Sequence, residues 1–222
     1  MQRTLKDSVM IVDNLPPKTL RRGRAEWLND EKYIKSAVEE VDRLKNHAGI
    51  TTSSNVLDVG CSTGKLLIGI KNSISSVNHY HGVDVDKKHI EWADKALSTD
   101  NYKFSYLNLQ NDRYNNGGKP IDDSFRFPTD RKFNIIYLYS VFSHMVTHDV
   151  IIYLREFRRI LDINGTVVMT VFIDNNIKDE EIIGTSFVKF NQQFFESLLS
   201  DFSIIRFEDK IVESYQSIYY LQ

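Results

Sequence analysis

The stretch at residues 55–66, NVLDVGCSTGKL, decides the fold of this 222-residue chain. Residues 55–59 set apolar side chains around a single acid, Asp58, which is the composition of a short buried strand. The small residues at 60–64 then predict a tight turn into a helix. Because such a turn leaves backbone N–H groups and a helix N-terminus uncovered, a ligand can approach the main chain closely. The stretch therefore predicts a nucleotide-binding loop.

The positions of the glycines indicate which nucleotide this loop binds. The dinucleotide pattern G-x-G-x-x-G would need glycine at Ser62 and Lys65, and neither position has one. The pattern E/D-x-G-x-G-x-G is typical of class I S-adenosylmethionine methyltransferases, and Asp58, Gly60 and Gly64 match it. Ser62 replaces the middle glycine. The loop thus resembles that family more than it resembles a nicotinamide-binding protein.

Composition limits the class of protein. With 28 basic and 30 acidic residues, the chain is near neutral, which argues against a protein built chiefly to coat nucleic acid or an anionic membrane. The single cysteine, Cys61, excludes an internal disulfide framework, and no Cys and His cluster has zinc-site spacing. No apolar run approaches the length of a membrane span. We expect a soluble, cytoplasmic protein that binds a small molecule and holds no metal.

Alternating strand and helix patterns predict the architecture. Strands are expected at 55–59, 79–86, 102–109, 133–139 and 166–173, with helices between them, and two closely spaced strands at 202–209 and 214–222 end the chain. Such alternation requires a parallel sheet with right-handed crossovers. We therefore predict an α/β, Rossmann-like, seven-stranded and mostly parallel sheet, with an antiparallel C-terminal edge strand and helices on both faces.

The first 28 residues have a different character. Pro16 and Pro17 interrupt any helix there, and a basic cluster follows at 18–24. Asn29 is a good N-cap for a helix whose apolar residues recur at helical spacing. We expect an N-terminal arm at 1–28 and a single domain at 29–222.

Two acids end the second predicted strand. A carboxylate at that strand end can accept hydrogen bonds from both hydroxyls of a ribose, and Asp84 is the candidate for this role, with Val85 beside it. Asp86 comes directly before a helical pattern and is better explained as its N-cap. The sequence thus predicts one binding acid and one capping acid.

Polar residues also follow the third and fourth predicted strands. Asn108, with Leu109, could read an adenine rim, and the alternative is an ordinary turn residue. Tyr139 and Ser140 come where the fourth strand ends, at the ligand-binding edge of a parallel sheet. His144 is the candidate catalytic base, because a histidine near neutral pKa can take a proton from a hydroxyl group. The alternative for His144 is a satisfied loop residue.

The remaining segments carry weaker predictions. Residues 110–132 are a long polar loop that is either functional or partly disordered, and polar residues 174–186 are expected to cover the acceptor side. His148 and Asp149 are expected to cap the next helix. On that helix, the arginines are expected to form a solvated face: Arg155, Arg158 and Arg159.

The chain resembles class I methyltransferases from about residue 28 to 222. The shared motifs are the loop at 58–64, Gly82-Val83-Asp84, the strand at 134–139 and REFRRILDINGTVVMT at 155–170. Within the family the chain is similar to a bacterial subgroup linked with sugar and cell-surface polysaccharide pathways, through LPPKTLR at 15–21, Asn108 and SVFSHM at 140–145. In that subgroup an arginine of the arm is implied to reach the cofactor, and either Arg21 or Arg22 could do so.

The resemblance implies a cofactor and a reaction. The cofactor is S-adenosyl-L-methionine, and the implied reaction is methyl transfer to a small-molecule or sugar acceptor, by O-methylation. Two alternatives stay open: a non-catalytic S-adenosylmethionine-binding scaffold, and an RNA or protein methyltransferase. The implied cofactor contacts are Asp58, Gly60, Cys61, Ser62, Gly64, Lys65, Leu66, Asp84, Val85, Asn108, Leu109, Tyr139 and Ser140.

Overall fold

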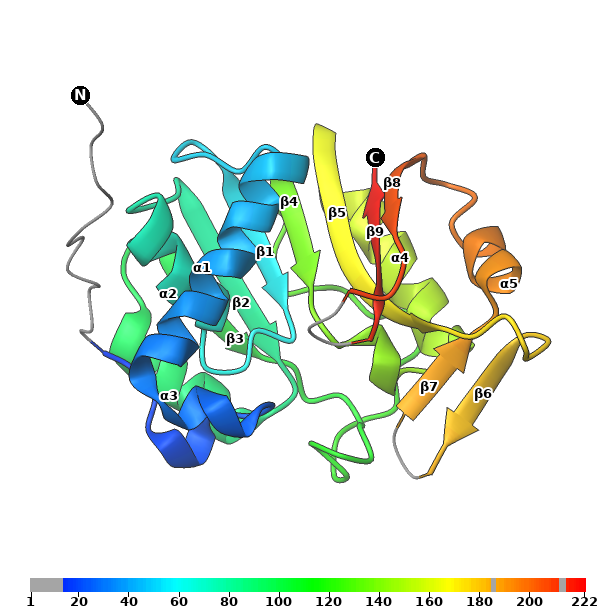
Figure 1. Ribbon diagram of the computed structural model, residues 1–222, viewed down its shortest axis with the longest axis horizontal. Helices are drawn as coiled ribbons and strands as arrows, with labels where there is room; N and C mark the ends of the chain where they lie inside the picture. Colours follow the sequence, from blue (N-terminus) through cyan, green and yellow to red (C-terminus); the bar gives the residue numbers. More distant parts are fainter. Residues whose placement is uncertain (1–13, 185–186, 212–214) are drawn as a thin grey trace.

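A mostly parallel sheet forms the centre of the molecule (Figure 1). The computed structural model describes residues 14–184, 187–211 and 215–222. Five strands run parallel in the order β3-β2-β1-β4-β5, and β9 joins β5 in the antiparallel direction. These strands are β1 (Asn55–Val59), β2 (His79–Asp84), β3 (Tyr102–Tyr106), β4 (Phe133–Leu138), β5 (Leu161–Ile173) and β9 (Ser217–Leu221). The predicted fold class is confirmed.

The sheet differs from the prediction in two details. β8 (Ile204–Glu208) pairs with β9 and forms the edge, so the reversed strand lies one position inside it. An additional antiparallel pair, β6 (Glu180–Ile183) and β7 (Phe187–Phe190), continues from the end of β5. The described residues therefore form nine strands instead of seven. The pair was missed because β6 is short and exposed on both faces, without the alternation that marks a half-buried strand.

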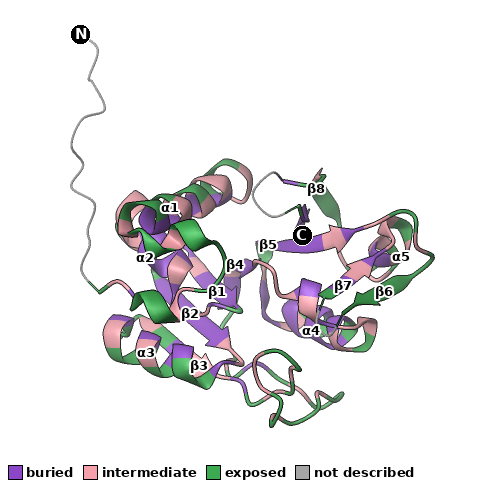
Figure 2. Ribbon diagram, turned by 60° about the horizontal axis from the view of Figure 1, so that its bottom comes forward, coloured by how far each residue is buried: buried purple, intermediate pink, exposed green. Residues whose placement is uncertain are grey.

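Helices cover both faces of the sheet, as predicted. One core lies under α1 (Asp30–His47), α2 (Lys65–Ser73) and α3 (Lys87–Leu97), and the other under α4 (Thr147–Ile160) and α5 (Gln192–Ser197). In Figure 2 the central strands are largely buried while the helices expose their outer sides. Gly69 lets α1 and α2 pack closely, because a Cβ there would lie 2.2 Å from the Ala37 carbonyl oxygen. No helix within the described ranges is long and apolar enough to cross a membrane.

Two of the three predicted helix N-caps are confirmed. The side chain of Asn29 accepts a hydrogen bond from the Lys32 N–H at the start of α1, and Asp86 does the same for two N–H groups of α3. The expectation that His148 and Asp149 cap α4 is wrong, since both lie inside its first turn. The first N–H of α4, that of Thr147, donates instead to Glu180 of β6 at 2.9 Å.

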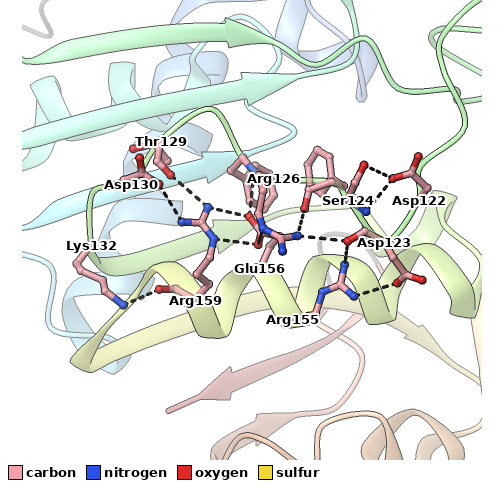
Figure 3. A network of polar contacts seen from close by, with 12 residues as sticks. Asp122, Asp123, Ser124, Arg126, Thr129, Asp130, Lys132, Arg155, Glu156 and Arg159 are labelled. Atoms are coloured by element: carbon pink, nitrogen blue, oxygen red, sulfur yellow. Dashed lines mark hydrogen bonds and ion pairs between the residues drawn. The ribbon is translucent and has the colours of Figure 1, made fainter.

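Loop 107–132 contains no helix and no named strand, as expected for the segment at 110–132. Its second half is fixed to α4 by ion pairs (Figure 3). Arg155 pairs with Asp123 at 2.9 Å, and Arg159 pairs with Asp130 at 3.3 Å. Arg155 is exposed, as expected for a solvated face, whereas Arg159 is partly buried by its contacts with the loop.

A buried carboxylate anchors this contact. Glu156 is 1% exposed and accepts hydrogen bonds from the Phe127 N–H at 3.0 Å and from the Arg159 guanidinium at 2.8 and 2.9 Å. These donors hold the pKa of Glu156 below its usual value against the opposing effect of burial. Charge pairing between helix and loop thus determines the course of a segment that has no periodic pattern of its own.

Candidate active site

The carboxyl ends of β1, β2 and β4 open onto a single cavity of about 1020 Å³. In Figure 1 these strands all point toward the loop that begins near residue 107 and toward the β6–β7 pair. Most of the residues predicted from sequence line the cavity, whereas Gly64 and Asn108 do not. Those in the lining are Asp58, Gly60, Cys61, Ser62, Lys65, Leu66, Asp84, Val85, Leu109, Tyr139, Ser140 and His144.

The loop after β1 has a left-handed backbone at three positions. Gly60 and Gly64 have φ of +72° and +74°, and a Cβ at Gly60 would lie 2.5 Å from a methyl carbon of Val141. Ser62, at the position of the family's middle glycine, also has a positive φ, of +51°. Its hydroxyl lies 3.0 Å from His89 Nδ1, a contact that glycine could not make. Serine therefore keeps the bent path of the loop, at the cost of some backbone strain.

Asp84 is held at the cavity wall by the main chain. One carboxylate oxygen accepts a hydrogen bond from the Ser62 N–H at 2.7 Å, and the other accepts one from the Asp86 N–H at 2.8 Å. Burial raises the pKa of Asp84, and these two N–H groups oppose that effect. Each carboxylate oxygen keeps a further lone pair for a ligand. The carboxylate is thus oriented before any ligand binds.

Asp58 lies deeper, under the same loop. It is 4% exposed and accepts a hydrogen bond from the Tyr80 hydroxyl at 2.5 Å. Burial raises the pKa of Asp58 to about 8, although the hydrogen bond from Tyr80 acts in the opposite direction. Nearby, Lys65 is paired with Glu40 of α1 at 2.6 Å. The charges in this half of the cavity therefore have partners within the protein.

The described part of the arm, residues 14–28, covers one side of the cavity. It contains two short 3-10 turns, η1 (Lys18–Leu20) and η2 (Ala25–Leu28). The side chain of Arg21 is only 3% exposed, pairs with Asp30 at 2.7 Å, and donates to two carbonyl oxygens of the arm. Arg22 instead lines the cavity, where it contacts Asp86 and lies 4.5 Å from the centre of the Tyr114 ring. Of the two arginines left open by the sequence, only Arg22 faces the cavity.

Ser140 marks the end of β4 with an unusual backbone. Its φ is +59°, and its N–H donates to Thr170 Oγ1 at 2.7 Å. Its hydroxyl accepts a hydrogen bond from the Gln216 side chain of the loop before β9 at 3.1 Å. Contacts from β5 and from the end of the chain therefore fix a strained residue at the cavity wall, as is common at functional sites.

His144 ends the short turn η3 (Phe142–His144) and lines the same cavity. The centre of its ring lies 5.0 Å from that of Phe187 in β7 and 5.7 Å from that of Tyr114. Its backbone is bound on both sides, since its N–H donates to the Val141 oxygen and its carbonyl accepts from Asn111. The structure thus brings His144 into the same cavity as Asp84, as predicted.

Asn108 lies outside the cavity lining. Its side-chain oxygen accepts hydrogen bonds from the Tyr106 hydroxyl at 2.9 Å and from Asn115 at 3.3 Å. These contacts fit the alternative interpretation, a turn residue that shapes the following loop. Leu109 and residues 110–114 line the cavity in its place.

Sequence reasoning missed several lining residues. Tyr33 and Glu40 lie seven positions apart on α1, a spacing that places them on one helical face, so a signal existed. For His89 the signal was a polar residue on the apolar face of α3. No periodic signal was available for the residues of the loop and the β6–β7 pair: Gln110, Asn111, Asp112, Arg113, Tyr114, Ile182, Phe187 and Val188.

A parallel sheet with a glycine-containing loop after β1, an acid ending β2 and a cavity across the strand ends defines a Rossmann-like nucleotide-binding enzyme. Residues 57–167, half of the chain, match the family described as methyltransferase domain. The chain belongs to this family and is an S-adenosylmethionine-dependent methyltransferase. In this family the nucleotide cofactor is S-adenosylmethionine.

Solved structures share the fold at low sequence identity. Magnesium protoporphyrin IX methyltransferase (ChlM) from Synechocystis PCC 6803, with bound SAH, has a TM-score of 0.56 and 15% identity, over 90% of this chain and 89% of that one. The glycopeptide N-methyltransferase MtfA, complexed with S-adenosyl-L-homocysteine, gives 0.58 and 11%, over 83% and 89%. A putative methyltransferase in complex with the Haloferax volcanii activator Trm112 gives 0.56 and 18%, over 86% and 80%.

Proposed function

We propose that this methyltransferase O-methylates a small-molecule or sugar acceptor, with the cofactor and the acceptor at opposite ends of the one cavity. A single observation carries the proposal: residues 60–63 of the loop, Asp84 and His144 line the same cavity. A cavity of about 1020 Å³ is at the upper end of the usual range for small-molecule sites, which accommodates two ligands.

The residues of the first half fit S-adenosylmethionine. The oriented carboxylate of Asp84 suits the ribose hydroxyls, and the bent loop brings main-chain N–H groups to the wall. We assign cofactor contacts to the predicted residues that line the cavity, and to Arg22. Gly64 supports the turn from outside the lining, because a Cβ there would lie 2.8 Å from Leu97.

When bound, the cofactor supplies an electrophilic methyl group on a positively charged sulfur. The protein then has to orient the acceptor and exclude water, and good orientation contributes on the order of 7–11 kcal/mol to such reactions. Phe187 and Val188 of β7 provide apolar walls for this purpose. His144, fixed by its backbone hydrogen bonds, is assigned as the base that accepts the proton of the acceptor hydroxyl.

Observations weigh against both alternatives. A scaffold that had lost its chemistry would be favoured by a disrupted cofactor loop, yet Ser62 keeps the loop bent and β4 pairs with β5 in the parallel sheet. An RNA or protein acceptor would need a basic groove. The basic residues of the arm and of α4 do not form one, because Arg21 pairs with Asp30, and Arg155 and Arg159 pair with Asp123 and Asp130.

The test has two steps. Calorimetry with S-adenosylhomocysteine establishes cofactor binding, and release of S-adenosylhomocysteine is then measured with acceptors that offer a hydroxyl or an amine. Product formation on a hydroxyl that His144→Ala reduces at every pH, while the remote His47→Ala variant stays active, supports the proposal. Turnover of amines alone would overturn O-methylation, and an unaffected His144→Ala variant would overturn the base role.

A further inference from the structure

Arg113 differs from the other cationic side chains of the cavity. Three lysine and arginine residues line the cavity within the described part of the chain: Arg22, Lys65 and Arg113. Arg22 contacts Asp86, and Lys65 is paired with Glu40. No carboxylate of the described residues forms an ion pair with Arg113, including the adjacent Asp112. Its charge at the cavity wall therefore has no anionic partner in residues 14–184, 187–211 and 215–222.

Arg113 is nevertheless held in place. Its guanidinium carbon lies 5.3 Å from the centre of the Tyr114 ring and 5.2 Å from that of Phe187, so it bridges the loop and β7. Figure 1 shows that loop next to the β6–β7 pair. The Asn111 side chain accepts hydrogen bonds from the N–H groups of both Arg113 and Tyr114 at 3.1 Å. The guanidinium is thus positioned before an acceptor arrives.

Stacking on rings leaves the edge of a guanidinium available. Its N–H groups project in the plane of the group, where they can bind a carboxylate or a phosphate in two places at once. His144 contacts the same two rings, Tyr114 and Phe187, so an anion on Arg113 would lie close to the assigned base. Asp84 and Asp58 also line the cavity, but their hydrogen bonds come from backbone N–H groups and from Tyr80, and neither forms an ion pair with Arg113.

We propose that the acceptor carries an oxyanion, a carboxylate or a phosphate, which Arg113 binds at the mouth of the cavity while an apolar or ring face of the acceptor packs on Phe187. This rests on the proposed function, because it places the acceptor at the His144 end. It narrows the acceptor from any small hydroxyl compound to an anionic one. Arg113 is then a residue that determines specificity.

Small aromatic probes test this inference. Benzoate, phenyl phosphate and the neutral benzamide are titrated by NMR into the full chain, with and without S-adenosylhomocysteine. We expect the anions to bind about tenfold or more tightly than benzamide, as a charged hydrogen bond would give. Arg113→Gln should remove this preference and leave benzamide binding unchanged, and Arg113→Lys should keep part of it. The better of the two anions identifies the oxyanion.

The controls separate the possible failures. Arg131 is exposed, lies outside the cavity lining and precedes β4, so Arg131→Gln should behave like the unchanged protein. An equal loss of anions and benzamide in Arg113→Gln would mean that Arg113 only ties the loop to β7, and would overturn the inference. Absence of any anion preference in the unchanged protein would also overturn it. Loss of S-adenosylhomocysteine binding would instead contradict the cofactor half, and the titrations without it remain readable.

Discussion

The two ends of the cavity are built by different kinds of interaction. At the cofactor end, backbone hydrogen bonds fix the wall: the N–H groups of Gly60 and Cys61 both donate to the Val83 oxygen, at 2.8 and 3.1 Å. At the acceptor end, side chains from distant segments meet, as when Phe187 contacts both His144 and Arg113. The cofactor end is therefore determined by the sheet, and the acceptor end by contacts that a few substitutions can change.

The charges differ in the same way. At the cofactor end, each charged side chain has a partner within the protein: Asp84 accepts a backbone hydrogen bond, Lys65 pairs with Glu40, and Arg22 contacts Asp86. Arg113 at the other end has no acid partner among the described residues. In our proposal, the groups of the cofactor end are therefore positioned before ligands bind, whereas Arg113 at the acceptor end acquires an anionic partner only when the acceptor binds. The following predictions separate the two ends, beginning with the variants that should weaken S-adenosylhomocysteine binding most.

The largest effect is expected at the β1 loop. Gly60→Ala places a Cβ 2.5 Å from Val141 and forces a left-handed backbone on alanine, which costs about 1–2 kcal/mol before the clash is counted. We expect loss of measurable S-adenosylhomocysteine binding by calorimetry and a lower unfolding temperature. Gly117→Ala is the matched control in loop 107–132, since a Cβ there meets nothing within 4 Å. Equal losses of S-adenosylhomocysteine affinity in the two variants would contradict the proposed difference between the two ends of the cavity.

A smaller loss of cofactor affinity is expected when Asp84, the proposed ribose ligand, is replaced. Asp84→Asn keeps the size of the side chain but replaces a charged acceptor by a neutral amide, and hydrogen bonds to charged groups contribute about 1.5–3 kcal/mol. S-adenosylhomocysteine should therefore bind about 10- to 100-fold more weakly in calorimetry. Asp100→Asn, at an exposed position outside the cavity lining, serves as the control. Unchanged affinity in Asp84→Asn would place the ribose elsewhere.

The attachment of loop 107–132 to α4 should depend on Glu156. Glu156→Gln removes the buried charge that binds Arg159 and the Phe127 N–H, and we expect a loss of about 1–3 kcal/mol in the free energy of unfolding. Denaturant unfolding measures it, with Glu39→Gln as the control because that residue forms only an exposed pair with Lys35. S-adenosylhomocysteine affinity should change little. A loss of cofactor binding equal to that of Asp84→Asn would show that the two ends are not independent.

The last prediction concerns stability, as a pH dependence of the unfolding temperature that Asp58 sets. Because the folded state raises the pKa of Asp58 from 3.8 to about 8, the folded protein binds more protons than the unfolded chain between these values. This group therefore favours the folded state most at low pH, and its contribution is lost as the pH rises to about 8. Asp58→Asn should gain unfolding temperature relative to the unchanged protein as the pH is raised from 5 to 8. A constant difference across that range would contradict the raised pKa.

The same contrast explains what could be predicted from sequence. The strands, the β1 loop and Asp84 follow from local composition and the rules of parallel sheets, and the structure brings them together as expected. Asn108 lies outside the cavity lining, where Tyr106 and Asn115 bind its side chain, and the spacing of residues in the sequence does not indicate these contacts. Arg155 is exposed as expected, but its pairing with an aspartate 32 positions away could not be predicted. Contacts between side chains of irregular segments leave no periodic trace in the sequence.

The β6–β7 pair and Arg113 belong to this second kind. β6 is a four-residue strand with every residue exposed, and Arg113 lies in a loop without regular structure. Each takes its role from a partner that is distant in sequence: β6 from the start of α4, Arg113 from Phe187. The sequence therefore predicts the residues proposed to hold the cofactor better than it predicts those proposed to bind the acceptor.

The most direct test of the central claim is a crystal structure of the full chain with S-adenosylhomocysteine. We expect the ribose hydroxyls to bind the Asp84 carboxylate, the amino-acid part to follow the loop at 60–64, and the sulfur to face the space between Ser140 and His144. A ligand whose ribose lies away from Asp84, or whose sulfur faces away from His144, would contradict the division of the cavity into a cofactor end and an acceptor end.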